Sequence, residues 1–251
     1  MAEALFHPHV APFRFEADTD DVAVLLHGWT GTPAHFRPLG RTLQEAGVTA
    51  IAPLLAGHGT TVAAMQATTW RDWLGSASAA AHSVGDGKRL HLVGLSMGGL
   101  LALLMAPTFS AATITTINAP MRVFDRTARF SWLMRGSSRT RERLAEPPPD
   151  PDVAEFYQQY DRSPMGTAAD LFDLARAARS ALWRVECPAL IIQSRADSTV
   201  RPVSAEIIHR EISSARKRLL WLESARHMSL ADPERRVIGD ALVAHIAAAA
   251  R

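Results

Sequence analysis

The feature of this sequence that most restricts its fold is a series of short strand-like segments, among them the continuous apolar run Val22–Leu26, separated by segments of helical periodicity. A strand that is apolar at every position is buried on both faces, as in a parallel sheet covered by helices. The alternation of strands and helices therefore predicts an α/β fold, with a mostly parallel central sheet and helices on both faces. Six strands are expected, at residues 22–26, 48–52, 90–95, 113–117, 189–193 and 218–222.

Helical patterns fill the gaps between these runs. The last of them repeats Ile238, Leu242 and Ile246 at four-residue spacing, which places them on one helix face. The predicted helices are residues 33–46, 69–84, 97–105, 203–212 and 233–249.

The alternation stops between Met121 and Trp183, where no pattern typical of a parallel strand occurs. The stretch contains the proline-rich run EPPPDP at Glu146–Pro151 and a further helical segment. It predicts an inserted helical cap at residues 121–183 on a core of residues 1–120 and 184–251. Its large apolar side chains are expected partly to attach the cap and partly to line a pocket: Phe124, Phe130, Trp132, Leu133, Met134, Phe156, Tyr157, Met165, Leu171, Phe172 and Leu174.

Arginines are concentrated in the first part of this insertion. A solvated helical face explains such a cluster best, and an anionic partner is the alternative. The net charge of the chain is only +2, so nucleic-acid binding is not indicated. The arginines are Arg122, Arg126, Arg129, Arg135, Arg139, Arg141 and Arg143, opposed by Asp125 and Glu142.

The remaining global features favour a cytoplasmic protein. No apolar run reaches the length of a membrane span, so stable membrane insertion is not expected. The N-terminus lacks the basic start and apolar stretch of a secretory signal. The single cysteine, Cys187, cannot form an internal disulfide and is expected to be a small buried side chain. The oligomeric state is not indicated.

The strongest chemical motif is Gly94-Leu95-Ser96-Met97-Gly98, which matches G-x-S-x-G between a predicted strand and a predicted helix. This context predicts a nucleophilic serine at a sharp, strained turn. A side chain at Gly94 or Gly98 is expected to collide across that turn. The amide of Met97, at a helix N-terminus, is expected to face a developing oxyanion.

A second oxyanion amide should come from the loop after the first buried strand, which reads His27-Gly28-Trp29-Thr30-Gly31. Gly28 lets the chain bend there, and Trp29 is the expected donor.

A serine hydroxyl needs a base, and His227 is the candidate because it follows the strand at 218–222 in a loop. Asp197, which follows the strand at 189–193, is the expected acid. Asp232 and Glu223 are the alternatives. Asp232 is better explained as a cap of the final helix, since Pro233 follows it, and Glu223 ends its strand too early.

Cofactor and metal motifs are not evident in the sequence. Gly57-His58-Gly59 is expected to shape a loop, because no further ligands stand near it at zinc spacing. Neither G-x-G-x-x-G nor a P-loop occurs, so no cofactor is expected.

The chain resembles the small bacterial carboxylesterases and monoacylglycerol lipases of the α/β-hydrolase superfamily. The resemblance lies in LLHGWTGTPAHFRPLGRTLQEAG, PLLAGHG, LHLVGLSMGGL, NAPM, SPMGTAADLFDL, PALIIQSRADSTVRP and SARHMSLAD. It implies the α/β-hydrolase fold, with Ser96 as nucleophile, Asp197 as acid and His227 as base, and with oxyanion amides at Trp29 and Met97. The family often has Phe or Leu where this chain has Trp29, and commonly Gly where it has Arg226.

These features predict a serine ester hydrolase that acts through an acyl-enzyme on short- to medium-chain esters and monoacylglycerols, without metal or cofactor. Two alternatives remain open. The same triad supports thioester hydrolysis, acyl transfer or peracid formation. A non-catalytic binding protein on a hydrolase scaffold is the other, although all three triad candidates are present.

Overall fold

The computed structural model describes residues 8–142 and 150–249, with the side chains of residues 126–129 left out. A seven-stranded sheet forms its centre, in the order β1-β3-β2-β4-β5-β8-β9. All neighbouring strands are parallel except the edge pair of β1 and β3. The strands are β1 (Phe13–Phe15), β2 (Asp21–Leu26), β3 (Thr49–Ala52), β4 (Arg89–Leu95), β5 (Thr113–Ile117), β8 (Ala189–Ser194) and β9 (Lys217–Leu222).

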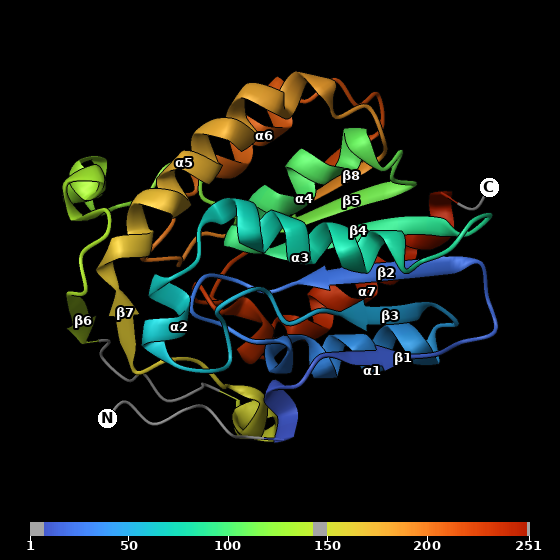
Figure 1. The fold of residues 1–251 in the computed structure, drawn as a ribbon. Coiled ribbons are helices and arrows are strands. Elements are labelled where there is room, and N and C mark those ends of the chain that lie inside the picture. The colour runs from blue at the N-terminus through green and yellow to red at the C-terminus, as the bar shows by residue number, and fades with distance from the viewer. Residues whose placement is uncertain (1–7, 143–149, 250–251) are drawn as a thin grey trace.

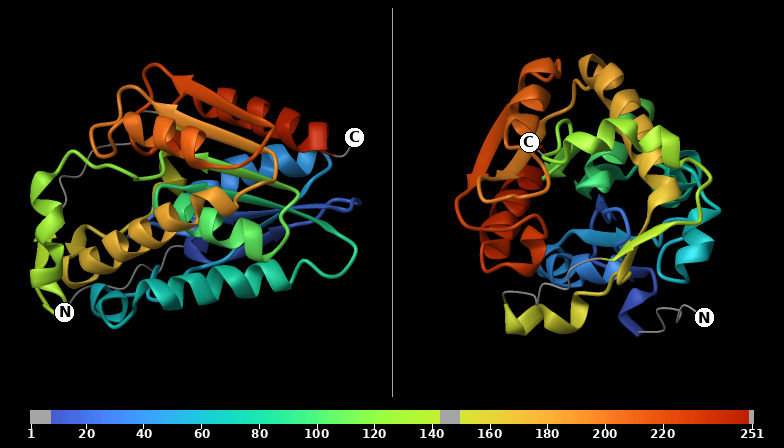
Figure 2. Two further views of the ribbon diagram at one scale, coloured as in Figure 1. Left: turned by 90° about the horizontal axis from the view of Figure 1, so that it is seen from above. Right: turned by 90° about the vertical axis from the view of Figure 1, so that its left-hand side faces the viewer.

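Helices cover both faces of this sheet (Figures 1 and 2). One face carries α3, α4, α5 and α6, and the other carries α1 and α7. The α-helices are α1 (Arg37–Glu45), α2 (Val62–Gln66), α3 (Trp70–His82), α4 (Met97–Thr108), α5 (Met165–Ala181), α6 (Val203–Glu211) and α7 (Arg235–Ala249). Short 3₁₀ segments are η1 (Pro8–Val10), η2 (Pro33–Phe36), η3 (Arg126–Met134), η4 (Pro151–Phe156), η5 (Leu182–Arg184) and η6 (Ser229–Ala231).

The two helical layers bury the two faces of the same strands. Along β2, Val22, Val24 and Leu26 pack toward α3 and α4, while Ala23 and Leu25 pack toward α1 and α7. Burial on both sides explains the continuous apolar run Val22–Leu26 of β2. The six predicted strands are confirmed, and with them the α/β-hydrolase arrangement.

Element boundaries differ from the predictions by one or two residues at several ends, and three helices show differences of more interest. The helix predicted from residue 33 begins as the 3₁₀ segment η2 before α1, and the final helix begins at Arg235 rather than at residue 233. The helix after Ser96 continues to Thr108, three residues beyond its predicted end. It tolerates Pro107 because this proline stands in its last turn, where the missing amide affects one hydrogen bond near the helix end.

The inserted segment holds two short antiparallel strands that the sequence analysis did not predict, β6 (Thr140–Glu142) and β7 (Arg162–Pro164). Figure 1 shows them at one end of the molecule, beyond the central sheet. The start of α5 lies in this region, whereas its later residues Leu174 and Ala178 belong to the core. The division at residues 121 and 183 therefore stays a prediction.

The arginine-rich stretch is largely exposed, as expected of a solvated face. It forms the 3₁₀ segment η3 rather than an α-helix. Arg135 pairs with Asp173 of α5, and Arg141 lies 3.7 Å from Asp125. Arg143 and most of the proline-rich run lie outside the described residues.

Candidate active site

The turn at Ser96 has the strained geometry that the sequence predicts. Ser96 has φ +54° and ψ −118° between β4 and α4, in a region that non-glycine residues rarely adopt. A Cβ atom on Gly94 would lie 2.1 Å from the carbonyl oxygen of Gly98, across the turn as expected. Crowding at Gly98 has another source, since its Cβ would lie 1.9 Å from the carbonyl oxygen of Leu26 on β2. Close packing of α4 on the sheet therefore accounts for Gly98.

Three side chains from three different loops meet at the C-terminal edge of the sheet. Nε2 of His227 lies 3.0 Å from Oγ of Ser96, and Nδ1 of His227 lies 2.8 Å from Oδ2 of Asp197. The carboxylate can only accept, so Nδ1 carries the proton and Nε2 accepts from the serine hydroxyl. This arrangement can remove a proton from Ser96 while Asp197 holds the imidazole.

The carboxylate of Asp197 is held by backbone contacts in addition to its hydrogen bond with His227. Its Oδ1 accepts the amides of Thr199 and Val200, both at 2.8 Å. The residue is 2% exposed. These contacts leave Oδ2 directed at the imidazole.

The two alternative acids do not occupy this position. Glu223 is exposed and pairs with Arg195. Asp232 is buried, and its carboxylate accepts the amide of Arg226, while its carbonyl accepts the amide of Arg235 at the start of α7. The prediction that Asp232 caps the final helix did not include the hydrogen bond from the amide of Arg226 to its carboxylate, and this bond anchors the loop that carries His227.

Arg226 replaces a glycine common at this position in related enzymes, and the backbone accommodates it. The non-glycine residues with positive φ in the described part of the chain are Thr30, Ser96, Ser110 and Asn118, so Arg226 needs no left-handed conformation. Its guanidinium lies 3.8 Å from the Asp232 carboxylate. The extra cation therefore stands beside a counter-charge.

Asn118 is a buried residue of the site that the sequence analysis did not single out, although it begins the NAPM block. Its φ is +50°, and it follows β5. Oδ1 accepts the amide of Ser194 at 2.8 Å, and Nδ2 donates to the carbonyl oxygen of His227 at 2.8 Å. One side chain thus connects the end of β8, which leads to Asp197, with the backbone of the histidine. An asparagine between a strand and a proline was the available signal.

The loop after β2 passes directly beside the nucleophile. A Cβ on Gly28 would lie 3.4 Å from Cβ of Ser96, and Trp29 lines the same pocket as Ser96 and His227. Met97 is the first residue of α4, and the first amides of a helix have no partner within it. Trp29 and Met97 stand where oxyanion donors are expected, and their role stays a prediction.

A pocket of about 390 Å³ opens over Ser96, a volume typical of small-molecule sites. Core and inserted segment both contribute to its wall. The residues that line it include Trp29, Pro120, Val123, Arg141, Glu142, Gln159, Ser163, Leu171, Val200 and Met228.

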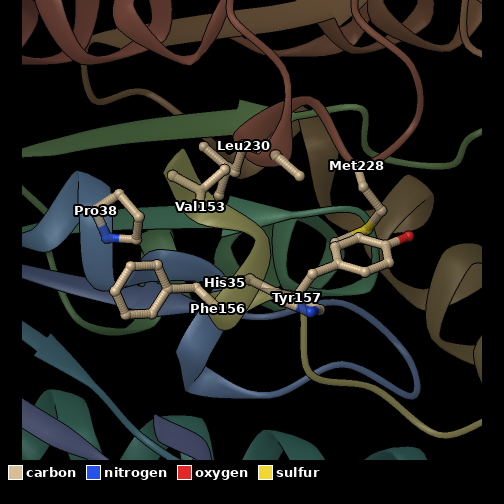
Figure 3. Close-up of a pocket in the computed structure, with 8 residues that line it drawn as sticks. His35, Pro38, Val153, Phe156, Tyr157, Met228 and Leu230 are labelled. Atoms are coloured by element: carbon tan, nitrogen blue, oxygen red, sulfur yellow. The ribbon is translucent and has the colours of Figure 1, made fainter. Parts of the chain in front are cut away.

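Of the apolar residues expected in the cap, Leu171 lines this pocket and Leu174 is buried in the core. Phe172 and Trp132 line a neighbouring pocket of about 490 Å³ between η3 and α5. Phe156 and Tyr157 face a small pocket beside the active site, together with His35 and Met228 (Figure 3). Four of the set are exposed: Phe124, Phe130, Trp132 and Leu133.

His27, His58 and Cys187 have surroundings that suit structural roles. His58 is buried, with its ring 4.9 Å from that of His27, and burial lowers its pKa to about 4. Gly57 and Gly59 have positive φ, as expected of a loop-shaping element. Cys187 is partly rather than fully buried, and this burial raises its pKa to about 11, away from a reactive thiolate.

Within the described residues, no three histidine, cysteine or acidic side chains are grouped to hold a metal ion. No helix in that part of the chain is both long and apolar enough to cross a membrane.

Comparison with known proteins gives a consistent set of relatives. Residues 23–240 match the family described as "Alpha/beta hydrolase family". A thermostable monoacylglycerol lipase of Bacillus sp. (strain H-257) is 34% identical over 89% of this chain and 90% of its own length. A carboxylesterase of Bacillus subtilis (strain 168) is 29% identical over 90% of this chain and 92% of its own.

Solved structures agree with these sequence relatives. One from work on LipS and LipT, two metagenome-derived lipolytic enzymes, has a TM-score of 0.88 at 32% identity, covering 96% of this chain and 98% of that chain. The monoacylglycerol lipase of Paleococcus ferrophilus shares the fold, with a TM-score of 0.76 at 19% identity over 93% of this chain and 98% of that chain.

Proposed function

Since this chain belongs to the α/β-hydrolase family, we propose that it is a carboxylic ester hydrolase with Ser96 as nucleophile, His227 as base and Asp197 as acid. The observation that carries the proposal is the chain of two hydrogen bonds that joins Asp197, His227 and Ser96, of which Ser96 and His227 line the pocket. The lipase and carboxylesterase names of the relatives support the same chemistry.

The reaction follows from the direction of these hydrogen bonds. His227 takes the proton of Ser96 through Nε2 as the hydroxyl oxygen attacks the ester carbonyl carbon, and Asp197 stabilises the imidazolium through Nδ1. The imidazolium then protonates the leaving alkoxide, and the alcohol departs. A water molecule, deprotonated by the same imidazole, cleaves the acyl-enzyme and restores Ser96.

The negative oxygen of each tetrahedral intermediate would accept hydrogen bonds from the amides of Trp29 and Met97. The helix N-terminus at Met97 and the approach of Gly28 to Ser96 support this assignment. Donors placed in advance at the developing charge supply a large part of the rate enhancement in such enzymes.

The substrate class we propose is simple esters of short to medium acyl chains and monoacylglycerols. Residues 121–183 are proposed to cap the site, supported by the pocket wall that Arg141, Gln159 and Leu171 supply. A pocket wall of mixed polarity suits one acyl chain and a small polar alcohol, whereas a triacylglycerol brings three chains to the same opening. Each methylene buried in the pocket adds at most about 0.8 kcal/mol of binding until the space is full.

A panel of p-nitrophenyl esters from acetate to palmitate, with a monoacylglycerol, an emulsified triacylglycerol and a matched thioester, tests the proposal. We expect kcat/KM to rise with acyl length and then fall, with Ser96→Ala inactive throughout. Long-chain triacylglycerol as the best substrate, without an optimum, would refute the single-chain pocket. A thioester hydrolysed far faster than its oxygen ester would instead favour thioesterase activity. Cytoplasmic location stays a prediction that fractionation of expressing cells tests.

A further inference from the structure

The loop that carries Trp29 is strained and must be held from outside. Thr30 has φ +65°, although a β-branched residue is disfavoured there. Such conformations persist where surrounding contacts determine them. Within the loop, the Thr30 hydroxyl donates to the carbonyl oxygen of Trp29 at 2.6 Å, and the amide of Gly31 donates to Gly28 at 3.0 Å.

The outside contacts come from the inserted segment, between Gln158 and Thr167. The amide of Tyr160 donates to the carbonyl oxygen of Thr30 at 3.2 Å, and the hydroxyl of Thr32 donates to the carbonyl oxygen of Gln158 at 2.9 Å. The indole Nε1 of Trp29 donates to Oγ1 of Thr167 at 3.1 Å. Three hydrogen bonds therefore join this segment to three residues of the loop, Trp29, Thr30 and Thr32.

Two of the three partners on the inserted segment, Thr167 and Tyr160, are themselves fixed. Thr167 is 1% exposed, and its hydroxyl donates to the carbonyl oxygen of Pro164 at 3.1 Å, which directs a lone pair toward the indole. The Tyr160 side chain is anchored in the core loop after β3, where its hydroxyl donates to Gly57 and accepts the amide of Thr60. The segment can therefore act as a rigid clamp.

We infer that Thr167 is a positioning residue, which through its hydrogen bond to the Trp29 indole holds the Trp29 amide toward the oxyanion. The link requires an indole donor, which a Phe or Leu at this position does not have. The inference rests on the proposed function and makes the inserted segment part of the catalytic geometry as well as of the pocket wall.

Variants at both ends of the hydrogen bond test the link. Thr167→Val removes the acceptor, Trp29→Phe removes the donor, and Thr167→Ser keeps the hydroxyl as the matched control. On p-nitrophenyl butyrate we expect kcat to fall about tenfold in Thr167→Val, with KM within about twofold, because the oxyanion forms only after binding. Thr167→Ser should restore kcat. The double variant should be no slower than Trp29→Phe alone, because both changes break one interaction.

Phenylboronic acid separates positioning from general destabilisation. Ser96 Oγ adds to its boron as the proton passes to His227, and a boronate oxygen takes the place of the oxyanion. We expect its inhibition constant to rise in Thr167→Val by about the factor by which kcat falls. The inference would be refuted if Thr167→Val, assayed well below its melting temperature, had the kcat and the inhibition constant of the wild type. It would also be refuted if the losses in kcat of the two single variants multiplied in the double variant. A wild-type enzyme without Ser96-dependent esterase activity would refute the proposed function itself, and the inference with it.

Discussion

Gly98 lies where α4 packs closely on the end of β2, two residues after Ser96, the proposed nucleophile. A methyl group at this position would stand 1.9 Å from the carbonyl oxygen of Leu26, where real Cβ contacts are not found below 3.0 Å. In Gly98→Ala the helix and strand must therefore separate by at least about 1.1 Å. Overpacking against rigid backbone costs about 1–3 kcal/mol of the free energy of unfolding. A displacement of about 1 Å beside Ser96 should also lower kcat by on the order of 100-fold.

Gly75 provides the matched control. It lies on the exposed side of α3, and a Cβ there would meet nothing within 4 Å. Gly75→Ala should therefore stabilise the protein by about 0.5–1 kcal/mol, the usual gain from alanine inside a helix, with unchanged kcat. Urea unfolding followed by circular dichroism gives the free energies, and p-nitrophenyl butyrate hydrolysis gives kcat. If Gly98→Ala were as stable and active as Gly75→Ala, the close packing of α4 on β2 would be wrong.

Further substitutions test the remaining contacts. Asp197→Asn should lower kcat by roughly 10⁴, since it favours the wrong imidazole tautomer, whereas Asp232→Asn should cost much less; the reverse order in steady-state kinetics would reassign the acid. Asn118→Asp keeps the positive φ but sets a carboxylate against the carbonyl oxygen of His227, so we expect kcat to fall about tenfold, and unchanged kinetics would exclude this anchor. Burial lowers the pKa of His58 to about 4, so as pH falls the imidazole is protonated in the unfolded chain before it is in the folded one. The free energy of unfolding should therefore fall by up to about 3 kcal/mol between about pH 6.5 and pH 4. In His58→Gln the free energy of unfolding from urea titrations should fall less steeply over this pH range, and an equally steep fall would contradict the burial of a neutral His58.

β2, β3, β4, β5 and β8 were predictable because they are buried on both faces and rich in apolar or β-branched side chains, and β9 because it carries the apolar run LLWL. The edge strand β1 escaped prediction, since only Phe13 and Phe15 mark it and both lie under arginines of α1, Arg37 and Arg41. β6 and β7 have three residues each, without an apolar run, and only their pairing with one another defines them. Pairing between residues so far apart leaves no local pattern in a sequence.

The candidate triad was predictable for a related reason. Ser96, Asp197 and His227 each follow a strand whose end lies at one edge of the sheet, so strand order alone predicts their meeting. Asn118 and Asp232 support the site differently, because their side chains form hydrogen bonds with backbone groups of Ser194, Arg226 and His227. Residue spacing along the sequence does not predict such partners.

Chemical labelling tests the central proposal most directly. A fluorophosphonate forms a stable phosphonyl ester with an activated serine, and mass spectrometry of the digested protein locates it. We predict one label per chain, on the peptide that contains Gly94-Leu95-Ser96-Met97-Gly98, and none in Ser96→Ala. Labelling on another serine, or undiminished labelling of Ser96→Ala, would contradict the assignment of Ser96 as the nucleophile.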